Sequence, residues 1–134
     1  GHSADRFIWR QMILGGDVLK LVNQTKRTVV AENLRIADTF FNRLRGLLGT
    51  SVLPAGEALL IRPCNNIHMF GMKYSIDVAF VDDTDHVLKT VEALRPGRFA
   101  CCSEARYVVE MPCGTLLATG TAMGDLLKVI EEPV

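Results

Sequence analysis

The chain has 134 residues, of which 49% are hydrophobic and 22% are charged, so it is long and apolar enough for one globular domain and is not a disordered chain. Fifteen Lys and Arg balance fifteen Asp and Glu, and a net charge of zero disfavours a broad surface for nucleic acid. The charge is uneven, because residues 1–50 carry eight basic and four acidic side chains while residues 51–134 carry seven and eleven. We expect the two parts to fold against each other, and an acidic partner for the basic part is the second interpretation.

The N-terminal residues show no complete leader and no membrane anchor, and removal of a natural export signal is the open alternative to a cytoplasmic location. Residues 1–3 resemble a tag remnant, so residues 1–17 are expected to be a tag remnant or a flexible segment before a single β-rich domain at 18–134. Asp17 ends the apolar stretch too early for a signal peptide, and no run approaches the roughly eighteen apolar residues of a membrane span. A core of this size needs no disulfides, so the four cysteines are expected to be reduced thiols in a cytoplasmic protein.

The first part of the chain predicts a hairpin followed by a helix. Short apolar runs at residues 18–22 and 28–31 flank a polar turn. Residues 38–49 then change to a helical period, with a cap at Asp38 or Thr39 and a stop at Gly49.

The remainder of the chain predicts short strands separated by turns. These strands are expected at residues 58–61, 76–81, 86–91, 107–111 and 126–130, with a hairpin turn at 82–85. The Gly-rich stretch at 114–124 leaves room for one helical turn. The pattern predicts a mainly β, single-domain sandwich or closed barrel with one short early helix.

The segment from Pro63 to Asp77 concentrates the side chains that could carry chemistry. In an extended strand Cys64 and His68 would project together, with Met72 beyond them, and Asp77 could orient the imidazole from the next strand. A thiol beside an imidazole can become nucleophilic. The alternative is structural, because Cys and Met commonly fill cores and a His commonly satisfies buried backbone groups.

Metal binding is a further alternative for the same segment. Cys64 and His68, joined by Cys101, Cys102 or Cys113, would offer ligands for zinc or copper, although no C-x-x-C pair is present. The acidic turn at 82–85 lacks the Gly and Glu of a calcium loop and is expected to be a solvated hairpin turn. No phosphate-binding loop, nucleophile elbow or zinc-protease motif occurs, so no cofactor and no catalytic residue are predicted.

Five blocks in order resemble the prokaryotic family known as domain of unknown function 192. They are RLRGLLG at 43–49, PC at 63–64 with IHMFGM at 67–72, IDVAFVD at 76–82, RPGR at 95–98 and VEMPCG at 109–114, and the series ends at Gly124-Asp125. The similarity extends from about Val18 to Ile130, and Leu48 and Cys113 stand where the family more often has Met and Ala. The resemblance implies a small, mainly β domain of jelly-roll or barrel type with a short early helix, and it implies no established activity.

Six polar or sulfur-containing side chains in these blocks are expected to converge on one ligand-binding concavity: Arg43, Cys64, His68, Met72, Asp77 and Arg98. His68 and Asp77 would form its hydrogen-bonding centre, and the arginines would receive an anion or a carboxylate. The competing interpretation is an internal ion pair between Arg43 and Asp77.

The sequence therefore favours a non-catalytic module that binds a small polar ligand or a peptide, with no nucleic acid and no membrane span. The alternatives are a thiol- or metal-dependent site centred on Cys64 and His68, and a structural domain that interacts through a sheet edge.

Overall fold

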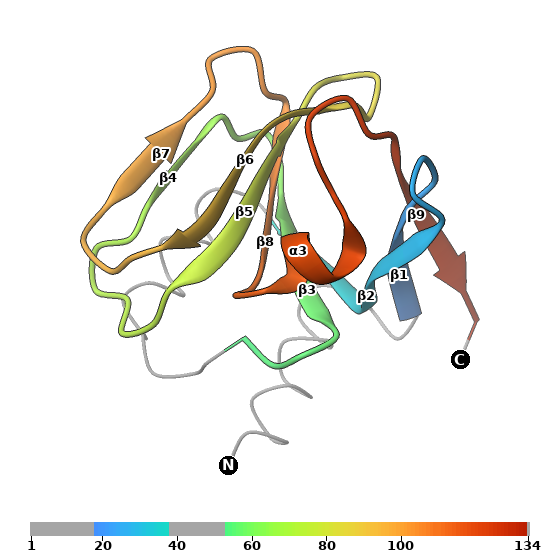
Figure 1. The fold of residues 1–134 in the computed structure, drawn as a ribbon, viewed down its shortest axis with the longest axis horizontal. Coiled ribbons are helices and arrows are strands. Elements are labelled where there is room, and N and C mark those ends of the chain that lie inside the picture. The colour runs from blue at the N-terminus through green and yellow to red at the C-terminus, as the bar shows by residue number, and fades with distance from the viewer. Residues whose placement is uncertain (1–17, 38–52, 134) are drawn as a thin grey trace.

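The computed structural model describes residues 18–37 and 53–133. Within them the chain forms nine strands and one short helix (Figure 1). The elements are β1 (Val18–Asn23), β2 (Thr28–Ala37), β3 (Glu57–Ile61), β4 (Asn66–His68), β5 (Ile76–Val81), β6 (Val87–Leu94), β7 (Phe99–Cys101), β8 (Tyr107–Pro112), α3 (Thr115–Thr119) and β9 (Leu127–Glu132).

Seven strands form one mixed sheet in the order β6-β5-β8-β3-β2-β1-β9. The pair β2–β3 is parallel, and the other neighbours are antiparallel. Strands β4 and β7 pair with each other as a separate two-stranded ribbon, which lies beside β6 in Figure 1. His86 and Leu126, which directly precede the outer strands β6 and β9, form an isolated bridge, and the described part of the chain forms no closed barrel.

The expected β-rich class is confirmed, and so are the predicted hairpins β1–β2 and β5–β6. The helical turn expected between Gly114 and Gly124 is α3, which begins after Gly114 (φ 94°) and ends before Gly120 (φ 71°), both in left-handed conformations. The helix predicted at 38–49 and the segment 1–17 lie outside the described residues. The described helix is far too short to cross a bilayer.

Alternate residues of the central strands pack into two different hydrophobic clusters, as the two-residue period of a strand requires. Ala79 and Val81 of β5 belong to the cluster that contains Leu116 of α3. Ile76, Val78 and Phe80 belong to the cluster that contains Ile67 of β4 and Ala100 of β7. Helix α3 therefore covers one face of the large sheet, and the β4–β7 ribbon covers the other.

Candidate functional site

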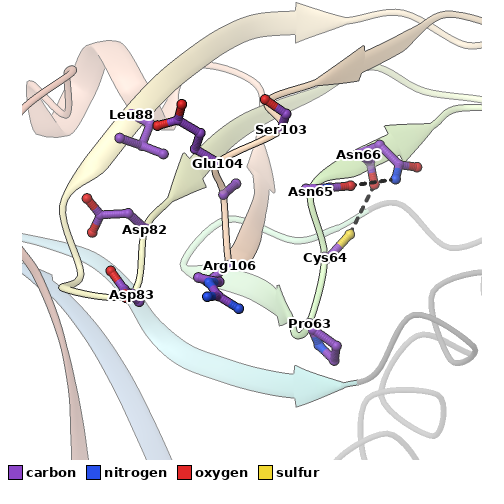
Figure 2. A pocket seen from close by; sticks show the side chains of 11 residues that line it. Pro63, Cys64, Asn65, Asn66, Asp82, Asp83, Leu88, Ser103, Glu104 and Arg106 are labelled. Atoms are coloured by element: carbon purple, nitrogen blue, oxygen red, sulfur yellow. Dashed lines mark hydrogen bonds between the residues drawn. The ribbon is translucent and has the colours of Figure 1, made fainter.

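A cavity of about 700 Å³ lies where three loops meet at one end of the β4–β7 ribbon. The first loop leaves β3, the second joins β5 to β6, and the third joins β7 to β8. Figure 2 shows Asp82 and Asp83 on one side, Pro63 and Cys64 on the other, and Arg106 between them. Volumes of this size are typical of small-molecule sites in proteins.

Main-chain hydrogen bonds hold the three loops in place. The Cys64 amide donates to the Arg106 carbonyl (3.1 Å), and the Cys102 amide donates to the Asn65 carbonyl (2.9 Å). The Arg106 amide in turn donates to the Val81 carbonyl at the end of β5 (2.7 Å). The main chain around the cavity is therefore held by hydrogen bonds between the loops and to the end of β5.

The polar lining of the cavity carries more negative than positive charge. Three carboxylates, those of Asp82, Asp83 and Glu104, lie around it with one guanidinium, that of Arg106. Among the described residues, Arg106 makes no ion pair within 4.0 Å. The side chains of Asn65 and Ser103 add neutral hydrogen-bonding groups. Such a lining attracts a ligand with a cationic group, and the Arg106 guanidinium can bind an anionic group of the same ligand.

Asp82 is fixed by the turn that it begins. Its Oδ1 accepts hydrogen bonds from the His86 amide (3.0 Å), the Thr84 amide (2.9 Å) and the Thr84 hydroxyl (2.8 Å). The His86 amide first, and then Thr84, hold the pKa of Asp82 below its usual value. The carboxylate is therefore ionised at neutral pH, and its second oxygen makes no hydrogen bond to the described residues.

Of the five expected site residues that the structure describes, Cys64 alone lines this cavity. It is only 8% exposed, and its thiol donates to the Asn66 carbonyl (3.0 Å). Burial raises the pKa of the Cys64 thiol, so the neutral form is favoured. A protonated thiol is a weak nucleophile, and this geometry gives no support to an activated cysteine.

His68 does not face Cys64. It is exposed at the end of β4, where its ring stacks against Phe70 (centroids 6.3 Å apart) and Phe99 (5.8 Å). The expected pairing required residues 64–68 to form one straight strand with both side chains on the same face. Instead, Cys64 precedes β4 and packs in the core, whereas His68 is exposed. The expected pairing of Cys64 with His68 is therefore wrong.

Asp77 is buried, with 1% of its surface exposed, and its carboxylate is occupied by the main chain. Oδ1 accepts from the Ala93 amide (2.9 Å), and Oδ2 accepts from the Gly114 (3.1 Å) and Leu116 (3.0 Å) amides. One carboxylate thus ties the β5–β6 bulge to the start of α3, where a negative charge suits the helix dipole.

The expected hydrogen-bonding centre of His68 and Asp77 is consequently not formed. Asp77 shares the face of β5 that holds Ala79 and Val81, under α3, whereas the ribbon that carries His68 covers the opposite face. The two side chains lie on opposite sides of the large sheet and cannot form the floor of one open concavity.

The remaining expected residues are also dispersed. Met72 is buried in the same cluster as Cys64, and Arg98 is exposed in the turn before β7. Arg43 lies outside the described residues, so its predicted ion pair with Asp77 stays a prediction. Ligand binding by the six residues likewise stays a prediction, and among the five within the described ranges Cys64 alone contributes to the cavity.

Sequence reasoning missed most of the cavity. Asp82 and Asp83 were expected only as a solvated turn, and Glu104 and Arg106 were not singled out. The sequence does indicate part of the cavity, because Asn65 and Asp82 each follow shortly after a predicted strand. Binding residues are often found in such loops. In residues 18–37 and 53–133, no three His, Cys, Asp or Glu side chains are grouped as metal ligands.

One family model and several proteins of Thermococcus and Pyrococcus species are similar to this chain in sequence. A family model described as DUF192, Uncharacterized ACR, matches residues 21–129. A UPF0127 protein of Thermococcus sibiricus is 38% identical over 123 residues, covering 84% of this chain and 77% of that protein. A UPF0127 protein of Thermococcus gammatolerans is 34% identical over 114 residues, covering 81% and 73%.

Two solved structures share the fold. One, from Sinorhizobium meliloti, has a TM-score of 0.69 at 19% identity and covers 84% of this chain and 92% of its own. The other, a protein of unknown function from Novosphingobium aromaticivorans, has a TM-score of 0.67 at 18% identity and covers 82% of each chain. At these identities the likeness concerns the fold alone.

Proposed function

The chain belongs to the DUF192 family, and from that premise we propose that it is a non-catalytic module that binds a small polar ligand or a peptide end. The family description assigns no activity, so the proposal rests on the site. The observation that carries it is the cavity of about 700 Å³ between the three loops, with charged and amide groups on a main-chain framework.

The lining favours a ligand that carries both an ammonium group and a carboxylate. The ammonium would lie against Asp82, Asp83 and Glu104, and the carboxylate would meet the Arg106 guanidinium, which forms paired hydrogen bonds with carboxylates. Amino acids and peptide ends have this chemistry. A buried, protonated Cys64 would add a weakly polar wall to the cavity rather than a reacting group.

The test is calorimetric titration of the full chain with the dipeptide Gly-Lys and with free lysine. We expect Gly-Lys to bind, and we expect Arg106→Ala to weaken binding by about tenfold, because a hydrogen bond to a charged group is lost. Asp83→Asn and Glu104→Gln should each weaken binding in the same direction. Lys128→Ala, an exposed cation on β9, is the matched control and should bind as the parent chain does.

Three results would contradict the proposal. The first is no binding of either probe by a folded chain. The second is equal binding by the parent chain and Arg106→Ala. The third is binding of an anion such as citrate in preference to both probes, since the charge around the cavity should repel it.

The thiol- or metal-dependent alternative has less support. Its two central side chains, Cys64 and His68, point in different directions, and the pKa of the thiol is raised by burial. Elemental analysis of protein purified without chelator addresses the metal version directly. Stoichiometric zinc or copper would favour it over the binding module.

A further inference from the structure

The outer face of the β4–β7 ribbon carries a row of exposed rings. Phe70 is 74% exposed and Phe99 is 64% exposed, and the exposed His68 ring lies between them with interplanar angles of 13° and 21°. The inner face is apolar and buried, with Ile67 and Ala100 at 1% and 7% exposure. Because side chains alternate along a strand, burying Ile67 and Ala100 forces His68 and Phe99 outward.

The chain around these rings is basic. We call residues 67–76 and 93–101 the basic aromatic lobe; they contain three cations, Lys73, Arg95 and Arg98, and no Asp or Glu. All three cations are exposed. A local charge of +3 in a chain of zero net charge is a marked asymmetry, and its sign is opposite to that of the acidic cavity lining.

Two of the cations are held next to the rings by main-chain hydrogen bonds. The Met69 amide donates to the Arg98 carbonyl (2.9 Å), and the Gly97 amide donates to the Met69 carbonyl (3.0 Å). Met69 lies between His68 and Phe70 in the chain, so the turn that contains Arg95 and Arg98 is fixed against the ring-bearing segment. The lobe therefore presents apolar rings with cations beside them.

The rings and the cavity lie at opposite ends of the ribbon. His68 pairs with Phe99 at one end, and Asn66 pairs with Cys101 at the other, from which the chain continues into the loops of the cavity. A partner seated on the rings would therefore leave the cavity open.

We propose that the basic aromatic lobe docks on the surface of an anionic lipid bilayer. Phe70 and Phe99 would enter the interfacial region, and the cations would contact lipid phosphates. Exposed Phe beside Arg and Lys is the composition of interfacial membrane-binding segments, and anionic leaflets attract such cations. Single-stranded nucleic acid fits less well, because the three rings turn their faces toward one another and leave fewer faces for bases.

The experiment is sedimentation of the full chain with vesicles of phosphatidylcholine alone or with 30% phosphatidylglycerol. We expect binding only to the anionic vesicles, and we expect it to decline as salt rises and screens the charges. Arg95→Gln and Arg98→Gln should each lower the partition coefficient about fivefold, the effect of one cation near an anionic surface. The double variant Phe70→Ser/Phe99→Ser should lower it by about tenfold or more.

The chain offers a matched control for the loss of exposed apolar groups. Leu117 and Met123 are 81% and 76% exposed at the opposite face, on α3 and the loop after it. Leu117→Ser/Met123→Ser should bind vesicles as the parent chain does. Thermal denaturation of each variant confirms that the fold is retained.

Four outcomes would overturn the proposal. These are no binding to anionic vesicles, equal binding to neutral vesicles, unchanged binding of the Phe70→Ser/Phe99→Ser variant, and an equal loss in the Leu117→Ser/Met123→Ser control. Binding of oligo(dT) that is lost in the Phe variant would assign the lobe to nucleic acid instead. None of these outcomes depends on whether Gly-Lys enters the cavity.

Discussion

The Asn23 amide donates from Nδ2 to Oδ2 of Asp125 over 2.9 Å, which joins two residues 102 positions apart in the chain. The same nitrogen donates to the Thr121 hydroxyl (3.1 Å), and Asn23 Oδ1 accepts from the Lys26 amide (2.9 Å). Asn23 is fully buried and Asp125 is 4% exposed. This network fastens the β1–β2 turn to the loop before β9, so it holds both ends of the described domain together.

Removal of the Asn23 side chain should destabilise the protein. Asn23→Ala removes two buried hydrogen bonds, to Asp125 and to Thr121, and the acceptor of the Lys26 amide, so we expect the free energy of unfolding to fall by about 2 kcal/mol. Urea denaturation measures the change. Gln24→Ala is the control, because Gln24 is exposed in the same turn and should change stability by less than about 0.5 kcal/mol. Equal effects of the two substitutions would contradict the role of the network.

The same network predicts a pH dependence of stability. Burial alone would raise the pKa of Asp125, but hydrogen bonds from Asn23, Lys26 and the Ala122 amide outweigh it and hold the pKa below the usual value. A lowered pKa in the folded state stabilises the fold above the unfolded value, about 3.9, and this contribution is lost as the pH falls through the folded pKa.

Denaturation at a series of pH values tests this linkage. The parent chain should lose stability below about pH 4, while Asp125→Asn should be less stable at pH 7 and change less on acidification. The comparison isolates one carboxylate, since the other acidic groups are the same in both chains. Parallel curves for the two proteins would count against the linkage.

The β5–β6 hairpin was predictable from sequence, because two β-branched runs flank an acidic turn and need only local pairing. Strands β4 and β7 were not, since each has three residues and too short a pattern to read. They pair across about thirty positions of chain, and their partner surface is the core beneath them. Such strands follow from tertiary packing rather than from local sequence.

The error over Asp77 has a similar cause. All six residues of β5 are buried, so the strand shows no alternation of polar and apolar positions that would tell which face Asp77 occupies. Cys64 was found because its residue type is distinctive. Glu104 and Arg106 were missed because they are ordinary surface residue types, and only the pairing of β7 with β4 and of β8 with β5 brings their loop to the cavity.

Because the ion pair between Arg35 and Glu57 is buried, substitution of one partner should strongly lower the free energy of unfolding. The two side chains are 7% and 2% exposed, and Arg35 Nη2 contacts Glu57 Oε1 between the parallel strands β2 and β3. Glu57→Gln removes the negative charge that faces the buried Arg35 guanidinium, so we expect a loss of about 3–5 kcal/mol in unfolding free energy. The double variant Arg35→Met/Glu57→Leu should recover most of this loss, because neither charge of this buried pair remains. Failure of the double variant to exceed the single one in urea denaturation would contradict this account.

Removal of the Asp77 side chain should lower the free energy of unfolding much more than removal of the His68 side chain. Asp77→Ala leaves three main-chain amides without an acceptor, so we expect a loss of at least about 3 kcal/mol, or failure to fold. Asp77→Asn retains one carbonyl oxygen and should fall between this variant and the parent chain. His68→Ala removes an exposed ring and should cost less than about 1 kcal/mol. Thermal and urea denaturation of the three variants decide the matter, and a similar loss for Asp77→Ala and His68→Ala would assign both to one structural cluster.

The structure also predicts that the Cys64 thiol reacts slowly with alkylating reagents at neutral pH. Burial raises the pKa of its thiol, so iodoacetamide labelling should have a midpoint above that of an ordinary thiol, about 8.5. The measurement needs Cys101→Ser/Cys102→Ser/Cys113→Ser, which leaves Cys64 as the single thiol. The same variant unfolded in urea is the control, and its midpoint should return to the ordinary value, because burial is the cause of the shift. A midpoint below about 8.5 in the folded protein would mean that the thiolate is stabilised, and it would restore the thiol-dependent site that the direction of His68 disfavours.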